Sequence, residues 1–337
     1  MLGFEGLTPS PQLTRFIEQY GLGGVILFTR NFSSVSQLTE LTESLQRLAV
    51  SNDAEIPLFI GVDQEGGRVQ RFKQPFTLIP NMRALGESQS PELVYQTGQL
   101  IGRELRWAGV NLDFAPVLDI ASNPLNPVIG DRAFSSDPQT VAKLGHEFIQ
   151  GMLQEGVIPV GKHFPGHGDT SQDSHLTLPR VDQPRQVLEQ RELQPFKHAI
   201  AGGLPAIMTA HVLYPHLDES HPASLSEKII SGLLRRELGF DGLVFSDDIC
   251  MKALDQQRLP ELAVQAVNAG TDILLICHAE EKQLDIAEAL LDAAEGGYIS
   301  PLCLDAAVDR ILRLKNRCLY PTPWPIYDKI SLLGRLG

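Results

Sequence analysis

Residues 156–175 read GVIPVGKHFPGHGDTSQDSH, an apolar run that passes directly into a polar loop. The loop from Lys162 to His175 contains one lysine, three histidines and two aspartates, more ionisable side chains than a merely structural loop needs. Its proline and glycines prevent a regular helix, so the histidines at positions 163 and 167 are not the helix-borne zinc pair that their spacing resembles. The stretch predicts a buried strand followed by an active-site loop.

The same pattern, a short apolar run followed by a helical stretch, recurs along the chain. Ser90-Pro91 and Asp137-Pro138 each place an N-cap residue before a proline at the first helical position, which marks the start of a helix. Eight apolar runs are candidate strands: Met1–Phe4, Gly24–Phe28, Leu58–Val62, Asn111–Val117, Ile158–Lys162, Ala206–Ala210, Leu243–Ser246 and Asp272–Cys277. Eight β/α repeats without a linker predict one α/β domain over residues 1–337, a single (β/α)8 TIM-type barrel. A doubly wound sheet, the alternative, would not need eight strands, and the sequence holds no G-x-G-x-x-G motif to support it.

In a barrel of this type the active site collects at the carboxyl ends of the strands. Polar or ionisable residues recur at those ends: Arg30-Asn31, Asp63-Gln64-Glu65, Asp119, Lys162-His163, His211, Asp247-Asp248 and His278. The start of a polar loop explains part of this pattern, but it does not explain carboxylates that directly follow an apolar strand. Because side chains alternate along a strand, Asp247 and Asp248 cannot both face one ligand. One of the two carboxylates can face the ligand, and the other is expected to contact a neighbouring loop.

Composition and charge exclude several classes of partner. The formal net charge is −13, and no basic run is present, which argues against nucleic acid because phosphate binding needs clustered Lys and Arg. The four cysteines form no C-x-x-C pair and are typical of free thiols in a reducing compartment. The N-terminus lacks the features of a secretory signal, and no apolar run approaches the roughly 20 residues that span a bilayer. We therefore expect a cytoplasmic monomer that binds neither nucleic acid nor membrane.

Several of these stretches together carry a family resemblance. The chain is similar to the bacterial β-N-acetylglucosaminidases of glycoside hydrolase family 3, and within them to the single-domain type that acts in peptidoglycan recycling. The similarity runs nearly from end to end, and the loop from Lys162 to His175 is its most specific part. It also includes residues 27–31, 62–69, 111–117, 130–134 and 246–248.

The resemblance implies a retaining exo-glycosidase that removes terminal β-linked N-acetylglucosamine from muropeptides or similar small carbohydrates, with no metal or organic cofactor. It implies that Asp247 is the nucleophile and that His175, oriented by Asp173, is the general acid/base. Most glycosidases use a second carboxylic acid for that role. An imidazole titrates at about 6.5, so it can both donate and accept a proton near neutral pH. The residues implied in sugar binding are Asp63, Arg71, Arg132, Lys162 and His163.

Other interpretations remain open from the residues alone. The adjacent acids at the end of the Leu243–Ser246 run also fit a substrate-assisted hexosaminidase, in which the acetamide of the substrate attacks. A β-glucosidase-type member of the family is a further alternative. A metal-dependent barrel hydrolase would use His163, His167, Asp169 and His175 as ligands. A degenerate barrel would bind a sugar or a partner without converting it. Independently of the reaction, Arg71 and Arg132 could be ordinary surface charges.

Overall fold

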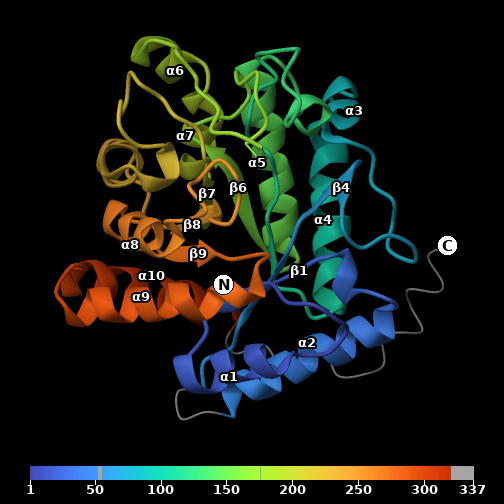
Figure 1. Ribbon diagram of the computed structural model, residues 1–337. Helices are drawn as coiled ribbons and strands as arrows, with labels where there is room; N and C mark the ends of the chain where they lie inside the picture. Colours follow the sequence, from blue (N-terminus) through green and yellow to red (C-terminus); the bar gives the residue numbers. More distant parts are fainter. Residues whose placement is uncertain (52–54, 175, 320–337) are drawn as a thin grey trace.

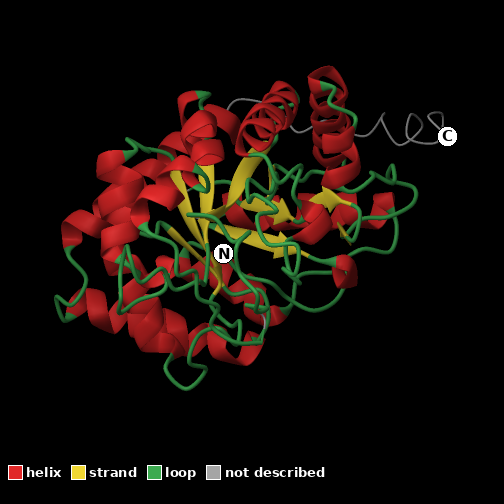
Figure 2. Ribbon diagram, turned by 90° about the horizontal axis from the view of Figure 1, so that it is seen from above, coloured by secondary structure: helices red, strands yellow, loops and turns green. Residues whose placement is uncertain are grey.

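A curled sheet of parallel strands forms the centre of the molecule. The computed structural model describes residues 1–51, 55–174 and 176–319 of the 337-residue chain. Within these residues, seven strands follow one another across the sheet: β1 (Gly24–Leu27), β2 (Phe59–Val62), β5 (Leu112–Asp113), β6 (Ile158–Phe164), β7 (Ala206–Thr209), β8 (Leu243–Asp248) and β9 (Ile273–Leu275). All neighbouring pairs are parallel. Seen from above, the strands lie in the middle and helices lie outside them (Figure 2).

The N-terminal segment occupies the position of the eighth strand. Met1–Phe4, predicted as a strand, is not a regular one, but Leu2 forms parallel bridges with Val25 of β1 and with Ile276 beyond β9. The N–H of Leu2 donates to the carbonyl of Gly24 at 3.2 Å, and the N–H of the next residue donates to that of Ile276 at 2.8 Å. The segment therefore joins the two edges of the sheet. The predicted TIM-type barrel is confirmed.

Two details at the carboxyl end of the sheet differ from the prediction. The run Asn111–Val117 is a regular strand only at Leu112–Asp113, although Val117 still forms a parallel bridge with Lys162. After β2 the chain forms an antiparallel hairpin, β3 (Gln64–Gly66) and β4 (Val69–Gln70), which the sequence did not predict. Its turn contains Gly66 and Gly67 with φ of 104° and 56°, a backbone conformation that glycine adopts without steric cost.

Helices cover the outside of the sheet (Figure 1). They are α1 (Pro11–Tyr20), α2 (Val35–Val50), α3 (Met82–Glu87), α4 (Pro91–Trp107), α5 (Pro138–Gln154), α6 (Arg185–Gln190), α7 (Leu193–Ala201), the π-helix η4 (Lys228–Glu237), α8 (Leu259–Ala269), α9 (Gln283–Glu295) and α10 (Pro301–Leu319), with 3₁₀ turns η1 (Thr29–Asn31), η2 (Gly130–Arg132), η3 (Ala223–Leu225) and η5 (Glu280–Lys282). Both predicted N-caps are confirmed, since Ser90 and Asp137 accept hydrogen bonds from backbone N–H groups of the first turns of α4 and α5. In the described part of the chain, no helix combines the length and the apolar composition required to cross a lipid bilayer.

The alternation of side chains on β8 determines what reaches the mouth of the barrel. Leu243 and Phe245 belong to the apolar cluster inside the barrel. Val244 lies between them and packs in a different cluster, which includes helix residues. Because successive side chains point to opposite faces, the next inward position is Asp247. The register between β8 and β9 shifts between Phe245 and Asp248, and both carboxylates reach the open end of the barrel.

Candidate active site

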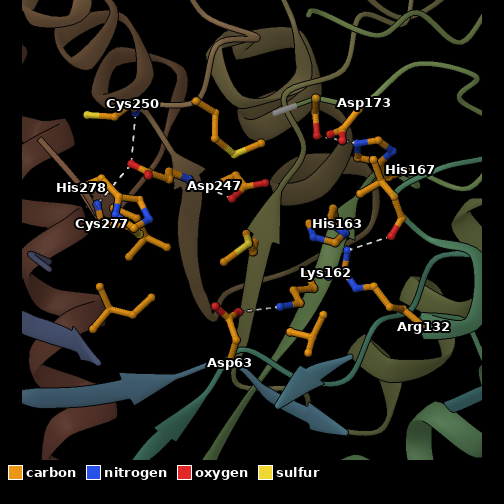
Figure 3. Close-up of a pocket in the computed structure, with 18 of the residues that line it drawn as sticks. Asp63, Arg132, Lys162, His163, His167, Asp173, Asp247, Cys250, Cys277 and His278 are labelled. Atoms are coloured by element: carbon orange, nitrogen blue, oxygen red, sulfur yellow. Dashed lines mark hydrogen bonds and ion pairs between the residues drawn. The ribbon is translucent and has the colours of Figure 1, made fainter. Parts of the chain in front are cut away.

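A pocket of about 520 Å³ lies at the carboxyl end of the barrel. The same alternation on β6, where Val160 faces the barrel interior, directs Lys162 to this end. All the described residues that the sequence predicted for catalysis or sugar binding line the pocket: Asp63, Arg71, Arg132, Lys162, His163, Asp173 and Asp247. Figure 3 shows several of them around one space. His175, the predicted acid/base, lies outside the described residues.

Lys162 is the centre of a buried charge cluster. Its side chain is 2% exposed, and its Nζ lies 2.8 Å from Asp63 Oδ1 and 2.7 Å from Glu65 Oε1. Arg132 donates to both oxygens of Glu65, from Nε at 2.9 Å and from Nη2 at 2.8 Å. Arg71 Nη2 donates to the second carboxylate oxygen of Asp63 at 3.2 Å. Three cations and two carboxylates therefore fix one another in one wall of the pocket.

The members of this charge cluster remain ionised because opposite charges face one another. Burial disfavours the charged form of Asp63, but Lys162 and Arg71 outweigh burial and hold the pKa of this carboxyl well below its usual range. Arg132 and Lys162 likewise lower the pKa of Glu65 to about 2 against the effect of burial. Burial also acts to lower the pKa of Lys162, yet the two carboxylates raise it. A wall of fixed charged donors and acceptors suits the hydroxyl groups of a sugar.

The two carboxylates at the end of β8 have different hydrogen-bond partners. Asp247 is half-buried in the pocket, and its Oδ1 accepts the N–H of Asp248 at 2.8 Å. Oδ1 of Asp248 accepts the N–H groups of Cys250 at 3.1 Å and of Cys277 at 3.2 Å, so it braces the loop after β8 and the end of β9, although it also reaches the pocket wall. Burial acts against the charge on Asp247, but nearby groups, His211 foremost, lower its pKa. Asp247 is therefore an ionised carboxylate at neutral pH.

Asp119 fixes the start of the predicted active-site loop. Its Oδ2 lies 2.6 Å from His163 Nδ1, and its carboxylate accepts the backbone N–H groups of His163 at 3.2 Å and of His167 at 2.6 Å. Burial alone would raise the pKa of Asp119, but His163 outweighs burial and the pKa is lowered. Because one ring nitrogen of His163 faces this carboxylate, the other nitrogen is left for a ligand in the pocket.

His167 links the beginning of the loop to its later part. Its Nδ1 lies 3.0 Å from Thr170 Oγ1, and its Nε2 lies 3.0 Å from Ser174 Oγ. Burial, followed by the charge of His163, lowers the pKa of His167 to about 4, so the ring is neutral at pH 7. A neutral imidazole has one N–H, so it donates to one hydroxyl and accepts from the other. The ring thus positions Ser174, the residue next to Asp173.

Two residues that support the pocket were not predicted. Glu65 belonged to a polar strand end and to one of the stretches that carry the family resemblance, but no role was predicted for it. Its role follows from the unpredicted hairpin, which directs it to the charge cluster. Asn126 gave no sequence signal, because an asparagine between prolines is typical of a turn. Its buried Nδ2 donates to the carbonyls of His167 and Gly168 at 2.8 and 3.0 Å, and to Thr170 Oγ1 at 3.1 Å. Its Oδ1 accepts two backbone N–H groups from the segment that leads to η2.

Three members of the ligand set of the metal-dependent alternative, His163, His167 and Asp169, lie within the described residues, and these three do not converge. The carboxylate of Asp169 does not line the pocket and instead accepts from Gln183 Nε2 and Arg191 Nη2, each at 2.8 Å. Both ring nitrogens of His167 face hydroxyl groups. Within the described residues, no three His, Cys, Asp or Glu side chains are arranged to hold a metal ion.

The fold and the pocket define the class of the protein, and a match to a family of known proteins defines its family. The fold and the pocket are those of a TIM-type barrel with an ionised carboxylate at its carboxyl end. Residues 3–314 match the glycosyl hydrolase family 3 N terminal domain. The chain belongs to this family, which confirms the resemblance noted in the sequence.

Individual relatives agree with the family assignment. A protein named Beta-hexosaminidase from Nitrosomonas eutropha is 44% identical over 276 residues, which cover 80% of this chain and 77% of that protein. A glycoside hydrolase family 3 beta-N-acetylglucosaminidase from Paenibacillus sp. str. FPU-7 has a TM-score of 0.94 at 42% identity. The match covers 100% of this chain and 66% of that one, so this chain spans about two thirds of its length. NagZ from Neisseria gonorrhoeae, solved in complex with N-trifluoroacetyl-D-glucosamine, has a TM-score of 0.80 at 34% identity over 93% of this chain and 88% of that one.

Proposed function

We propose that the chain is a retaining exo-β-N-acetylglucosaminidase with Asp247 as its nucleophile. The observation that carries this proposal is the position of an ionised Asp247 in the pocket whose wall contains the charge cluster around Lys162. The names of the curated relatives and the sugar derivative bound to the Neisseria protein support the choice of an N-acetyl sugar. In this proposal His175, paired with Asp173, is the general acid/base.

The proposed reaction has two steps. In the first, a carboxylate oxygen of Asp247 attacks the anomeric carbon while the bond to the leaving oxygen breaks and His175 gives that oxygen its proton. In the second, His175 takes a proton from water, the oxygen of that water attacks the anomeric carbon, and the ester bond to Asp247 breaks. Asp173 would favour the imidazolium form of His175 and hold its ring in place.

In this proposal the wall that contains the charge cluster holds the sugar. Asp63 keeps acceptor capacity beyond the two cations that it binds, and Lys162 and Arg132 keep donors beyond those that face carboxylates. We propose that these groups and His163 bind the ring hydroxyls and the acetamide. The proposed natural substrates are muropeptide fragments in the cytoplasm that carry N-acetylglucosamine on an anhydro-N-acetylmuramic unit, hydrolysed by a monomer.

Paired aryl β-glycosides test this proposal. We expect the wild type to hydrolyse the N-acetylglucosaminide in preference to the glucoside, and Asp247→Ala to lose at least about 10⁴-fold in kcat. Preference for the glucoside would indicate the β-glucosidase-type alternative. No turnover of either glycoside, with or without added zinc, would contradict the enzyme proposal and favour the sugar-binding barrel.

A 2-fluoro glycoside that lacks the acetamide separates direct attack from substrate-assisted catalysis. If Asp247 is the nucleophile, mass spectrometry of the digested protein will show a stable glycosyl ester on that residue. In a substrate-assisted enzyme the acetamide would be the nucleophile, so no adduct would form. The Asp247→Asn variant is the control, because its amide cannot form the ester.

A further inference from the structure

Glu65 touches the pocket only through other residues. Its side chain is 1% exposed and is not part of the pocket lining, yet it binds two residues that are. Glu65 lies on β3, the hairpin strand that follows β2. It therefore contacts Lys162 and Arg132 from the side that faces away from the pocket. A carboxylate in this position does not contact a sugar in the pocket, so any effect it has on the reaction passes through Lys162 and Arg132.

Glu65 occupies some of the N–H donors of Lys162 and Arg132 and leaves the others available. The ammonium group of Lys162 has three N–H bonds, of which one faces Glu65 and one faces Asp63, so one is left for a ligand. The guanidinium of Arg132 has five N–H bonds, of which two are taken by Glu65 and one by the carbonyl of Val128 at 3.3 Å. Two remain. Glu65 thus determines which donors of each cation can face the pocket.

Stability alone is a weak explanation for this carboxylate. Burying an ion pair costs desolvation energy that offsets much of the attraction, so a buried pair is poor evidence for a stabilising role. Asp272 provides a comparison elsewhere in the chain. Its side chain is also 1% exposed and also bridges two cations, Arg235 at 2.6 Å and Arg310 at 3.1 Å. Oδ2 of Asp272 also accepts the N–H of Val244 at 2.7 Å, but neither arginine lines the pocket, so Asp272 offers a similar buried bridge whose cations do not reach the ligand.

We propose that Glu65 is a positioning residue for the glycosidase reaction, and that it orients Lys162 and Arg132 toward the sugar. Without its charge, both cations turn toward the remaining carboxylates at the mouth of the barrel, Asp63 and Asp247. They would then neutralise the nucleophile and withdraw donors from the sugar. This inference rests on the proposed function, because the readout is the binding and hydrolysis of an N-acetylglucosaminide.

The test compares Glu65→Gln with the matched variant Asp272→Asn. An amide carries no charge and keeps only one acceptor oxygen, so it cannot attract the two cations as a carboxylate does, and its NH₂ group cannot accept from Arg132 Nε. We expect Glu65→Gln to lower kcat/KM for an aryl N-acetylglucosaminide by about 10–100-fold and to raise the inhibition constant of N-acetylglucosamine by about tenfold. Asp272→Asn should lower the melting temperature comparably but leave both constants within about twofold of wild type. Equal kinetic effects of the two variants would overturn the proposal.

A double-mutant cycle then shows whether Glu65 acts through Arg132. If it does, the loss in kcat/KM for Glu65→Gln combined with Arg132→Ala will be clearly smaller than the product of the two single losses. Multiplicative losses would overturn the proposal. Should Glu65→Gln fold poorly, Glu65→Asp takes its place, because it keeps the charge but is too short to reach both cations.

A last measurement separates failure of this inference from failure of the proposed function. If wild type hydrolyses no aryl glycoside, the proposed function fails. Calorimetric titration of wild type, Glu65→Gln and Asp272→Asn with N-acetylglucosamine still tests the positioning role. Binding that is weakened only in Glu65→Gln supports it, and binding that is unchanged or absent in all three contradicts it.

Discussion

Two consecutive parts of the active-site loop have opposite environments. The inner half, residues 162–170, is buried except for the half-buried Asp169. In the outer half, residues 171–174 and 176–178, Asp173 is half-buried, Ser174 is buried and the other five residues are exposed. The inner half carries the proposed sugar-binding groups Lys162 and His163, whereas Asp173 of the proposed acid/base pair lies in the outer half. One motif therefore joins a buried binding wall to a mostly exposed surface segment.

The difference arises from where each half finds hydrogen-bond partners. Backbone groups of the inner half bond to Asp119 and Asn126, which come from the preceding β/α repeat and are themselves buried. In the outer half, the N–H groups of residues 176 and 177 bond to the carbonyl of Asp173, within the same turn. Changes in the inner half should therefore cost both stability and activity, and changes in the outer half should cost little stability.

Among the variants that separate the two halves of the loop, the largest effect is expected for Asp119→Ala. The substitution leaves two buried N–H groups and one imidazole nitrogen without their acceptor, so the free energy of unfolding should fall by about 3–5 kcal/mol. Loss of ring orientation at His163 should lower kcat/KM roughly 1000-fold. Urea unfolding and aryl glycoside kinetics measure the two effects. Asp137→Ala, which removes only the N-cap of α5, is the control and should cost about 1 kcal/mol with unchanged kinetics.

A smaller loss of stability and activity, with a single steric cause, is expected for Gly168→Ala. An added Cβ would lie 1.6 Å from the carbonyl oxygen of Ile120, so the inner half would have to move away from its support. We expect a loss of about 3 kcal/mol or more in unfolding free energy, together with reduced turnover. Gly23→Ala is the matched control, because its Cβ meets nothing within 4 Å. If both variants unfold at the same urea concentration, the inner half is not packed as tightly as the structure indicates.

The pH dependence of stability tests the burial of His167. Its pKa falls from 6.5 to about 4 on folding, so between these pH values the unfolded chain binds more protons than the folded one. The neutral ring therefore stabilises the fold fully above pH 6.5, and up to about 3 kcal/mol is lost as the pH falls toward 4. Glu192 has the opposite effect on the pH dependence of stability. Burial raises the pKa of Glu192 to about 7, so the stability that it contributes is lost as the pH rises from 4.5 to 7. The free energy of unfolding of wild type and of His167→Asn, measured at several pH values, isolates the contribution of the histidine. Only wild type should lose the stability that depends on His167 as the pH falls from 6.5 to 4. If the two curves of unfolding free energy against pH are parallel, the low pKa of His167 is contradicted.

The sequence predicted those parts of the site that depend on local periodicity. The alternation of side chains along a strand indicated that only one of Asp247 and Asp248 can face a ligand, and the family resemblance selected Asp247. Ser90 and Asp137 were predictable as N-caps because capping is a contact within one helical turn. Asp173 and His175 were identified only through the family resemblance, and no local pattern supplied their roles.

Residues whose partners lie in another repeat could not be predicted. Asn126 bonds a loop that begins some forty residues later, and nothing near it in the sequence indicates that contact. Glu65 depends on a hairpin with a pair of glycines at its turn, which changes the direction of the chain directly after β2. For Asp169 the local motif was misleading. It suggested a metal ligand, but the carboxylate of Asp169 accepts hydrogen bonds from Arg191 and Gln183, which lie outside the motif.

The smallest effects distinguish the two halves most directly. Ser174→Ala removes the hydroxyl that faces His167 Nε2, so we expect a loss of about 1 kcal/mol in stability. Because this serine lies between Asp173 and His175, turnover should fall about tenfold for a poor leaving group but hardly at all for an activated aryl glycoside, which needs no proton from the general acid. Leu176→Ser is the control, since that side chain is 64% exposed and its replacement should change stability by less than about 0.5 kcal/mol. If Ser174→Ala slows both substrates equally, the hydroxyl supports the pocket as a whole, and the division between a binding half and a proton-transfer half does not hold.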